Sequence, residues 1–236
     1  LWKVSGGVLE LQATDDKSFV AVRGQAPFQD DCQEEKTVVP AEAFKLVLGL
    51  SGDNEEVEVR IGNGNIHFSS DSGRISHRLL QPRYPEARNR LKKKHKTEAV
   101  VRLPASVLFK AVKQMFLGDR ISMSADGAKG VLSLKSGDAR GEAEVILDIA
   151  DVEVGDKVMA GIEKSGKAVY GTNLLMNVLR VVKPEVLLSI RMGGETPTII
   201  QAMDGDFLAA IAPMSFAETP KEEEKPEKEK DGRTGG

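Results

Sequence analysis

The stretch "KAVYGTNLLMNVLRVVKPE", residues 167–185, decides the fold of this chain. Its first residues are typical of a β-strand, Thr172 and Asn173 are suited to cap a helix, and apolar residues then recur until Pro184, before which a helix must end. Three further β-rich runs follow, separated by Gly and Asp turns: "EVLLSIRMGGE", "TPTIIQAMDG" and "DFLAAIAPM". The sequence therefore predicts a strand–helix–strand–strand–strand unit over residues 168–212.

The same unit recurs twice upstream. The unit at residues 38–80 starts within "KTVVPAEAFKLVLGL" (36–50), which reads as a short strand, a proline at a helix start and an apolar helix, and three β-rich runs follow. Between these copies, "PASVLFKAVKQMF" predicts a helix over residues 104–116, followed by the hairpin "RISMSADGAKGVLSLKS" and the strand "GEAEVILDIA". Two such units make a compact domain with strands on one side and two helices on the other. The predicted class is α+β with repeated β-α-β-β-β units and antiparallel sheets.

The repeats divide the chain into two domains and a tail. Residues 98–216 hold two complete units, whereas residues 1–91 hold one complete unit preceded by the hairpin "VLELQATDD" and "KSFVAVRGQ". An open start of this kind exposes an unpaired edge and half a core, so we expect a strand and a helix to precede Leu1. Residues 92–97 form a basic linker. Residues 217–236 are charged and lack large apolar side chains, which predicts a disordered tail.

Bulk composition excludes several functional classes. The 236 residues carry a formal net charge of -3, and Cys32 is the single cysteine, so no disulfide forms within the chain. No apolar run approaches the roughly 18 residues of a membrane span, and no secretory leader is visible, which indicates the cytoplasm. Positive charge is concentrated in "QPRYPEARNRLKKKHK", residues 81–96. This run is either a solvated connector that adds diffuse positive potential or a direct contact to a polyanion.

Four stretches together resemble one known family. They are "LQATDDKSFVAV" (11–22), "RISHRLLQPRYPEARNRL" (74–91), "EAEVILDI" (142–149) and "FLAAIAPMSF" (207–216). Their order and spacing look like those of the bacterial sliding clamp, the β subunit of DNA polymerase III, over about residues 1–216. A complete member of that family has three such domains and closes into a ring as a dimer. The chain resembles most of the middle domain and the whole C-terminal domain.

The resemblance implies a DNA clamp fold, with sheets outside and helices lining a concave inner face around duplex DNA. Attraction to phosphates would be independent of sequence. Candidate DNA-facing positions on or next to the predicted helices are Lys45, Lys110, Lys113, Arg180 and Lys183. The other interpretation is that these are the ordinary solvated faces of amphipathic helices. The implied partners are double-stranded DNA, the DNA polymerase III α subunit, the clamp loader and other proteins with a clamp-binding motif. If the full-length chain exists, self-association into a ring is also implied.

The family also has a pocket for partner peptides between its middle and C-terminal domains. Carried over by motif, its candidate residues are Thr14, Asp16, Lys17, Phe19, Pro85, Asn89, Arg90, Ala210, Ala212, Pro213 and Met214. For the apolar members, plain core packing is the alternative. The chain departs from the family where Asp16 and Lys17 replace Gly-His, Ala87 replaces an aromatic residue, Ala212 replaces Met, and Ser215-Phe216 replace Arg-Leu. These departures put the peptide specificity in question.

No catalytic set is recognisable in the sequence. The chain contains three histidines, and His67 and His77 fall on neighbouring predicted strands without a metal-ligand spacing. We therefore expect a non-enzymatic processivity factor that needs no cofactor or metal. A peptide-binding module or fragment that cannot close around DNA is the alternative, and a two-domain clamp that forms a trimer is a weaker one.

Overall fold

The computed structural model describes residues 1–15, 17–25, 35–50, 56–80, 96–115, 118–139, 141–149, 153–154, 157–158 and 160–214. Its first part contains the strands and helix β1 (Trp2–Ser5), β2 (Val8–Thr14), β3 (Ser18–Gln25), β4 (Glu35–Thr37), α1 (Ala41–Leu50), β5 (Glu58–Gly62), β6 (Asn65–Ser70) and β7 (Gly73–Arg78). The unit predicted over residues 38–80 is present as β4-α1-β5-β6-β7, but its first strand lies just before the predicted start, at Glu35–Thr37. The predicted N-terminal hairpin is β2 and β3, and β1 adds a third strand to it.

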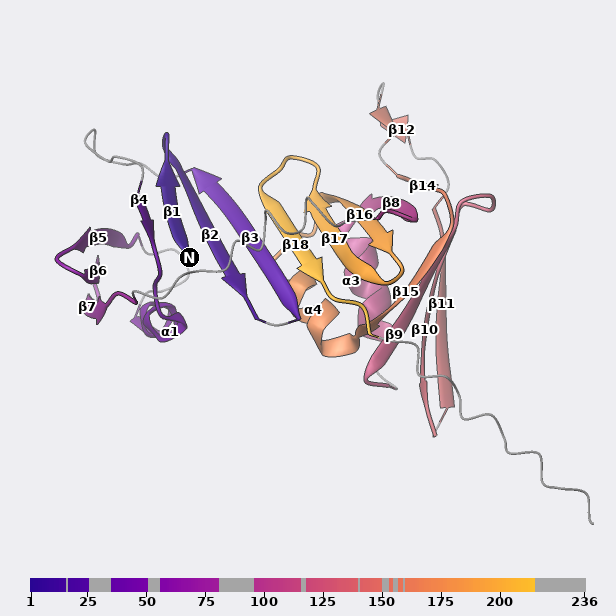
Figure 1. Ribbon diagram of the computed structural model, residues 1–236, viewed down its shortest axis with the longest axis horizontal. Helices are drawn as coiled ribbons and strands as arrows, with labels where there is room; N and C mark the ends of the chain where they lie inside the picture. Colours follow the sequence, from indigo (N-terminus) through magenta and orange to yellow (C-terminus); the bar gives the residue numbers. More distant parts are fainter. Residues whose placement is uncertain are drawn as a thin grey trace, which may run out of the picture.

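The second part contains two further copies of the unit (Figure 1). The first is β8 (Ala99–Pro104), α3 (Ala105–Gln114), β9 (Arg120–Asp126), β10 (Val131–Asp138) and β11 (Gly141–Asp148). Three short strands follow: β12 (Glu153–Val154), β13 (Lys157–Val158) and β14 (Gly161–Glu163). The last copy is β15 (Gly166–Gly171), α4 (Thr172–Arg180), β16 (Leu187–Gly193), β17 (Thr196–Ala202) and β18 (Phe207–Ile211). All three predicted copies are therefore present.

Two-residue turns set the register of two hairpins. Gly6 and Gly7 have φ of 57° and 77° and connect the paired residues Ser5 and Val8. Asn63 and Gly64 have φ of 52° and 73° and connect Gly62 to Asn65 in the same way. Positive φ at both central positions is the conformation that matches the twist of a tight hairpin, and glycine and asparagine adopt it at low cost.

The described strands form one large sheet and three smaller ones, of which the smallest is the pair β12-β13. The nine-stranded sheet has the order β14-β8-β16-β17-β18-β3-β2-β1-β4, and separate sheets hold β11-β10-β9-β15 and β5-β6-β7. β18 pairs with β3, so this sheet runs without interruption from the C-terminal unit into the N-terminal strands (Figure 1). The sequence predicted the strands but not this pairing.

Helices α3 and α4 lie side by side, and each packs one face against the sheets (Figure 1). α3 contacts β8 and β11, and α4 contacts β15 and β18, so each helix touches both the large and the four-stranded sheet. Buried Leu108, Ala111 and Val112 recur at helical spacing on α3, as Leu175, Val178 and Leu179 do on α4. These residues join one continuous core with strand residues such as Met123, Leu134 and Ile190.

The N-terminal part has its own smaller core. Trp2, Ile66 and Phe68 are buried there with Ala43 of α1. Trp2 stacks on Phe44 with ring centroids 6.2 Å apart, and Phe44 meets Phe68 edge-on at 6.0 Å. Apolar aromatic contacts of this kind hold α1 against the sheets.

Two local predictions about helix starts are corrected. Pro104 was expected to begin a helix, but it is the last residue of β8, with φ −61° and ψ 141°, and α3 begins at Ala105. Thr172 was expected to cap α4, but the N-cap is Gly171, without a side-chain cap hydrogen bond. Thr172 is already helical, and its hydroxyl donates to the carbonyl oxygen of Gly118 at 2.8 Å. The hydroxyl is therefore used in a tertiary contact.

Candidate nucleic-acid interface and partner site

The sides of α3 and α4 opposite their buried residues carry polar side chains. Lys110 and Lys113 lie one turn apart and exposed on α3, and Arg180 is exposed at the end of α4. α4 also exposes Asn173 and Asn177 at i and i+4. Because the two helices lie in contact, three cations and two amides from separate copies of the unit share one surface.

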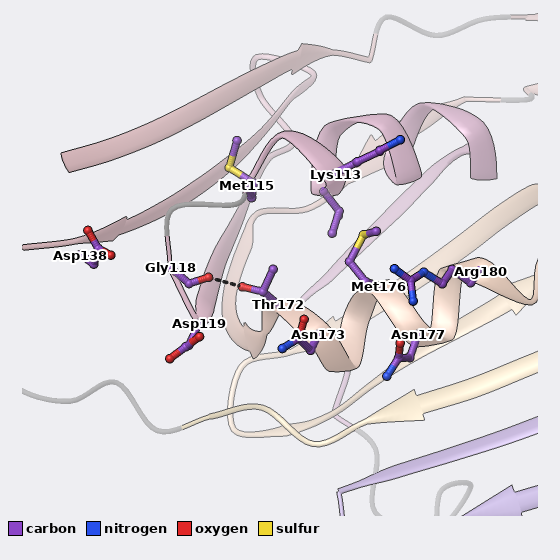
Figure 2. A pocket seen from close by; sticks show the side chains of 11 residues that line it. Lys113, Met115, Gly118, Asp119, Asp138, Thr172, Asn173, Met176, Asn177 and Arg180 are labelled. Carbon is purple, nitrogen blue, oxygen red and sulfur yellow. Dashed lines mark hydrogen bonds between the residues drawn. The ribbon is translucent and has the colours of Figure 1, made fainter. Parts of the chain in front are cut away.

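A cavity of about 400 Å³ opens between these helices (Figure 2). Its lining includes Lys113 from α3, and Asn173, Met176, Asn177 and Arg180 from α4. Figure 2 shows the two asparagines and Arg180 along α4, with Lys113 on the facing helix. Two of the predicted DNA-facing residues therefore line a single cavity.

The floor of the cavity is fixed by the residues that follow α3. Thr172 donates twice to this segment, from its hydroxyl to the Gly118 carbonyl at 2.8 Å and from its backbone N–H to the Asp119 carbonyl at 2.9 Å. A Cβ at Gly118 would lie 2.8 Å from the Gly137 carbonyl oxygen, so no larger residue fits there without movement. These contacts set where α4 begins relative to the end of α3.

The charges around the cavity are unevenly arranged. Asp119 and Asp138 also line it, and in Figure 2 they lie beyond the start of α4, whereas Arg180 lies at the helix end. Among the charged residues that line the cavity, the cations lie on the helices, and the carboxylates lie just before β9 (Asp119) and at the end of β10 (Asp138). Such a surface can attract a polyanion along the helices without forming a tight anion site.

The other three predicted DNA-facing residues lie outside this cavity, and Lys110 is exposed on α3 one turn before Lys113. Lys45 is exposed on α1, and Lys183 is exposed in the turn after α4; neither lines the cavity. Sequence reasoning missed Asn173 and Asn177. Their four-residue spacing opposite the apolar positions of α4 was the available signal.

Predicted partner-site residues from two distant stretches meet where β3 pairs with β18. Phe19 lies opposite Ala210, and both are buried together with Ala21 in a small cluster that Leu208 adjoins. The chain after β18 continues alongside the start of β3, since the backbone N–H of Ala212 donates to the Lys17 carbonyl at 2.9 Å. The motif-based assignment thus concerns residues that are neighbours in space.

Around this junction the predicted residues differ in exposure. Lys17 is exposed, and Thr14, Ala212 and Pro213 are half-buried. Met214 is 37% exposed, and its backbone N–H donates to the Val169 carbonyl at 2.8 Å. The buried Phe19 and Ala210 serve as packing, whereas Lys17 and Met214 are accessible to a partner.

Asp15 holds the loop between β2 and β3 in shape. Its carboxylate accepts hydrogen bonds from the backbone N–H of Lys17 at 2.8 Å and from the backbone N–H and hydroxyl of Ser18 at 2.5 and 3.0 Å. The hydrogen bond from Lys17 is the main cause that lowers the pKa of Asp15, because it stabilises the ionised form. The loop that carries Thr14 and Lys17 is therefore ordered by its own side chains.

Several predicted features lie outside the described residues. They are the partner-site residues Asp16, Pro85, Asn89 and Arg90, most of the basic linker at 92–97, and the tail at 217–236. His67 and His77 are described, and their ring Nδ1 atoms lie 2.7 Å from the Ser76 hydroxyl and 3.0 Å from the Arg78 carbonyl oxygen. In the described part of the chain, no three His, Cys, Asp or Glu side chains gather as metal ligands do, and no helix there is long and apolar enough to cross a membrane.

Solved structures show what this arrangement of sheets and helices is similar to. A DNA polymerase sliding clamp from Bacillus subtilis aligns with a TM-score of 0.75 at 17% identity, covering 91% of this chain and 56% of that chain. The DNA polymerase III subunit beta from Pseudomonas aeruginosa aligns with a TM-score of 0.72 at 17% identity, covering 91% and 57%. No family model and no curated protein sequence matches. The chain therefore has the fold of the bacterial DNA polymerase III β-subunit sliding clamps, and it spans little more than half of their length.

Proposed function

We propose that this chain acts in a sliding clamp that encircles duplex DNA and tethers the replicative polymerase. The observation that carries the proposal is the shared surface of α3 and α4, where Lys113 and Arg180 line one cavity and Lys110 is exposed one turn before Lys113. The likeness in fold to sliding clamps supports it. The role is non-catalytic, needs no cofactor and belongs in the cytoplasm.

The mode of DNA binding follows from the side chains on this surface. Lysine and arginine attract phosphates regardless of base sequence, and the amides of Asn173 and Asn177 are able to donate hydrogen bonds to phosphate oxygens. Weak, diffuse attraction of this kind lets a ring slide.

The partner site is the surface around the β3 and β18 junction. Buried Phe19 and Ala210 provide a fixed base, and Met214 offers a flexible, polarisable contact for an apolar peptide anchor. The partners proposed for it are the DNA polymerase III α subunit, the clamp loader and other proteins with a clamp-binding motif. The exposed ammonium of Lys17 favours peptides with an acidic residue near the anchor.

Topological retention tests encirclement. The protein is threaded onto linear duplex DNA whose ends are then blocked with streptavidin, and the complex is washed at high salt, which weakens electrostatic contacts. We expect retention on the blocked duplex and release after a restriction cut between the blocks. Equal loss from blocked and cut DNA would rule out encirclement.

A second candidate function is a peptide-binding module that does not close around DNA. It is favoured by the position of the β3 and β18 junction, which lies entirely within this chain. Fluorescence anisotropy with a labelled clamp-binding peptide separates the two functions. Binding that Met214→Ala weakens, together with failed retention on blocked DNA, would favour the module, whereas a peptide that does not bind at all would exclude it.

A further inference from the structure

The cavity between α3 and α4 carries opposite charges at its two ends (Figure 2). Lys113 of α3 and Arg180 of α4 are exposed toward one end, whereas Asp119 and Asp138 are exposed beyond the start of α4. Duplex DNA would use only the cationic end, because carboxylates repel phosphates. The DNA-facing role therefore leaves the carboxylate end of the cavity without an explanation.

Both cations and one of the carboxylates keep their charges available to a ligand. Within the described part of the chain, Lys113, Asp119 and Arg180 take part in none of the ion pairs. The backbone carbonyl of Asp119 accepts a hydrogen bond from the N–H of Thr172 at 2.9 Å, which fixes this residue while its side chain stays exposed. The cavity therefore offers a positioned acceptor at one end and two cationic donors at the other.

The size of the cavity fits a small molecule. Its volume of about 400 Å³ lies in the range of roughly 300–1,000 Å³ that is typical of small-molecule sites. α4 rises about 12 Å between Thr172 and Arg180, at about 1.5 Å per residue, so a ligand that reaches both ends must be comparably long. A free amino acid, whose charged groups are adjacent, is too short. A nucleotide, with its phosphate and the outer edge of its base at opposite ends, has the required length.

The lining between the two ends is suited to a sugar and a flat ring. Asn173 and Asn177 lie one turn apart on the exposed side of α4, and their amides both donate and accept hydrogen bonds, as ribose hydroxyls require. Half-buried Met176 offers a polarisable thioether, which makes favourable contacts with aromatic rings. Buried Val112 and Met115 complete the apolar part of the wall.

The carboxylate of Asp119 selects among the bases. An ionised carboxylate accepts hydrogen bonds and donates none. Guanine presents its N1–H and its N2 amino group side by side, so both oxygens of one carboxylate can accept from it at once. On the same edge, adenine, cytosine and uracil each place an acceptor next to their donor, which a carboxylate repels. The acidic end therefore favours guanine.

We propose that this cavity binds a guanine nucleotide, with its phosphate at Lys113 and Arg180 and its base at Asp119. The ribose lies along the two asparagines, and the base lies against the methionine. The guanidinium of Arg180 is suited to the phosphate because it donates two parallel hydrogen bonds. A bound nucleotide would share both cations with DNA, so a regulatory effect on DNA binding rests on the proposed function, whereas the site itself does not.

The test is a titration of the whole nitrogen-15-labelled chain with guanosine 5′-monophosphate, followed by the amide NMR shifts of α3 and α4 in the absence of DNA. We expect saturable shifts there below about 10 mM ligand. Adenosine 5′-monophosphate and ribose 5-phosphate should each bind at least about 10-fold more weakly, because both lack the paired donors. Inorganic phosphate probes the cationic end alone and should not reproduce the shifts near Asp119.

A matched exchange of base and side chain gives the decisive comparison. Xanthosine 5′-monophosphate carries a carbonyl oxygen where guanine carries its N2 amino group, and an asparagine amide can donate to that oxygen. Asp119→Asn should therefore lose at least about 10-fold in affinity for the guanosine nucleotide and come to prefer the xanthosine nucleotide. Arg180→Gln should weaken both nucleotides equally, by about 10-fold. Asp71→Asn and Arg60→Gln, at exposed positions in the N-terminal part, are the controls and should bind like wild type.

Three results would each overturn the proposal. They are the absence of shifts at about 10 mM guanosine 5′-monophosphate, equal binding of that nucleotide and ribose 5-phosphate, and an Asp119→Asn variant that keeps the wild-type preference for guanine. None of them would bear on encirclement, because retention on blocked duplex DNA is measured without nucleotide.

Discussion

Replacement of Lys110, Lys113 and Arg180 with glutamine tests the helix surface directly. If each cation neutralises one phosphate, each contributes about 0.9 to the magnitude of the slope of log Kobs against log salt. Loss of all three should then lower that magnitude by about 2.7. From about 50 to 200 mM salt, the wild type should consequently lose about 40-fold more DNA affinity than the variant.

The assay is fluorescence anisotropy with two duplexes of unrelated sequence, which should give the same slope because phosphates are the target. The matched control replaces Lys129, Lys135 and Lys164, three exposed lysines on the hairpins and turns of the four-stranded sheet, with glutamine. It changes the net charge equally and should leave the slope close to that of wild type. An unchanged slope in the helix variant, or an equal decrease in the control, would refute the assignment of α3 and α4 as the DNA-facing surface.

Three further predictions concern the framework of these sites. Phe19 is buried, with 3% exposed area, so Phe19→Ala leaves a cavity and should lower the free energy of unfolding in urea by about 3–5 kcal/mol. A loss below about 1 kcal/mol would mean that the β3 and β18 junction does not depend on this side chain. Burial raises the pKa of Tyr170 to about 12 from 10.0, so the neutral form is favoured in the folded state. Stability should therefore fall by about 2 kcal/mol between pH 10 and pH 12 relative to Tyr170→Phe, and parallel pH profiles would contradict this. Gly118→Ala should lower the melting temperature, since its Cβ would lie 2.8 Å from the Gly137 carbonyl oxygen. Gly24→Ala is the control, because a Cβ there meets nothing within 4 Å, and it should leave the melting temperature nearly unchanged.

The repeated unit could be predicted because short stretches of sequence determine its strands, helices and turns. Strands of alternating exposure such as β11, and helices with buried residues three and four apart, need no information from elsewhere in the chain. Turn residues such as Gly194 and Gly205 add the hairpin positions. Local errors included the helix starts, where Pro104 completes a strand and the hydroxyl of Thr172 bonds to Gly118, and the short strands β12 to β14, which were not predicted.

The candidate sites were predicted less completely, because they depend on long-range pairing. Phe19 and Ala210 meet only because β18 pairs with β3, and no local pattern specifies which edge strands join. The cavity likewise depends on the contact between two helices of different units. Sequence motifs placed Lys113 and Arg180 on helices, but the packing of those helices brought both residues to one cavity.

One pairing rule accounts for how the units combine. The strand before each helix pairs with the first strand after the helix of the other unit: β8 pairs with β16, and β15 pairs with β9. β4 pairs with β1, the first of the three-strand run, in the same manner. Each unit thus contributes one strand to the sheet of the other unit, so neither unit can bury its helix alone. α3 and α4 therefore pack against each other and against both sheets. Their polar sides must then face the same way, so the shared cationic surface is a consequence of the strand exchange.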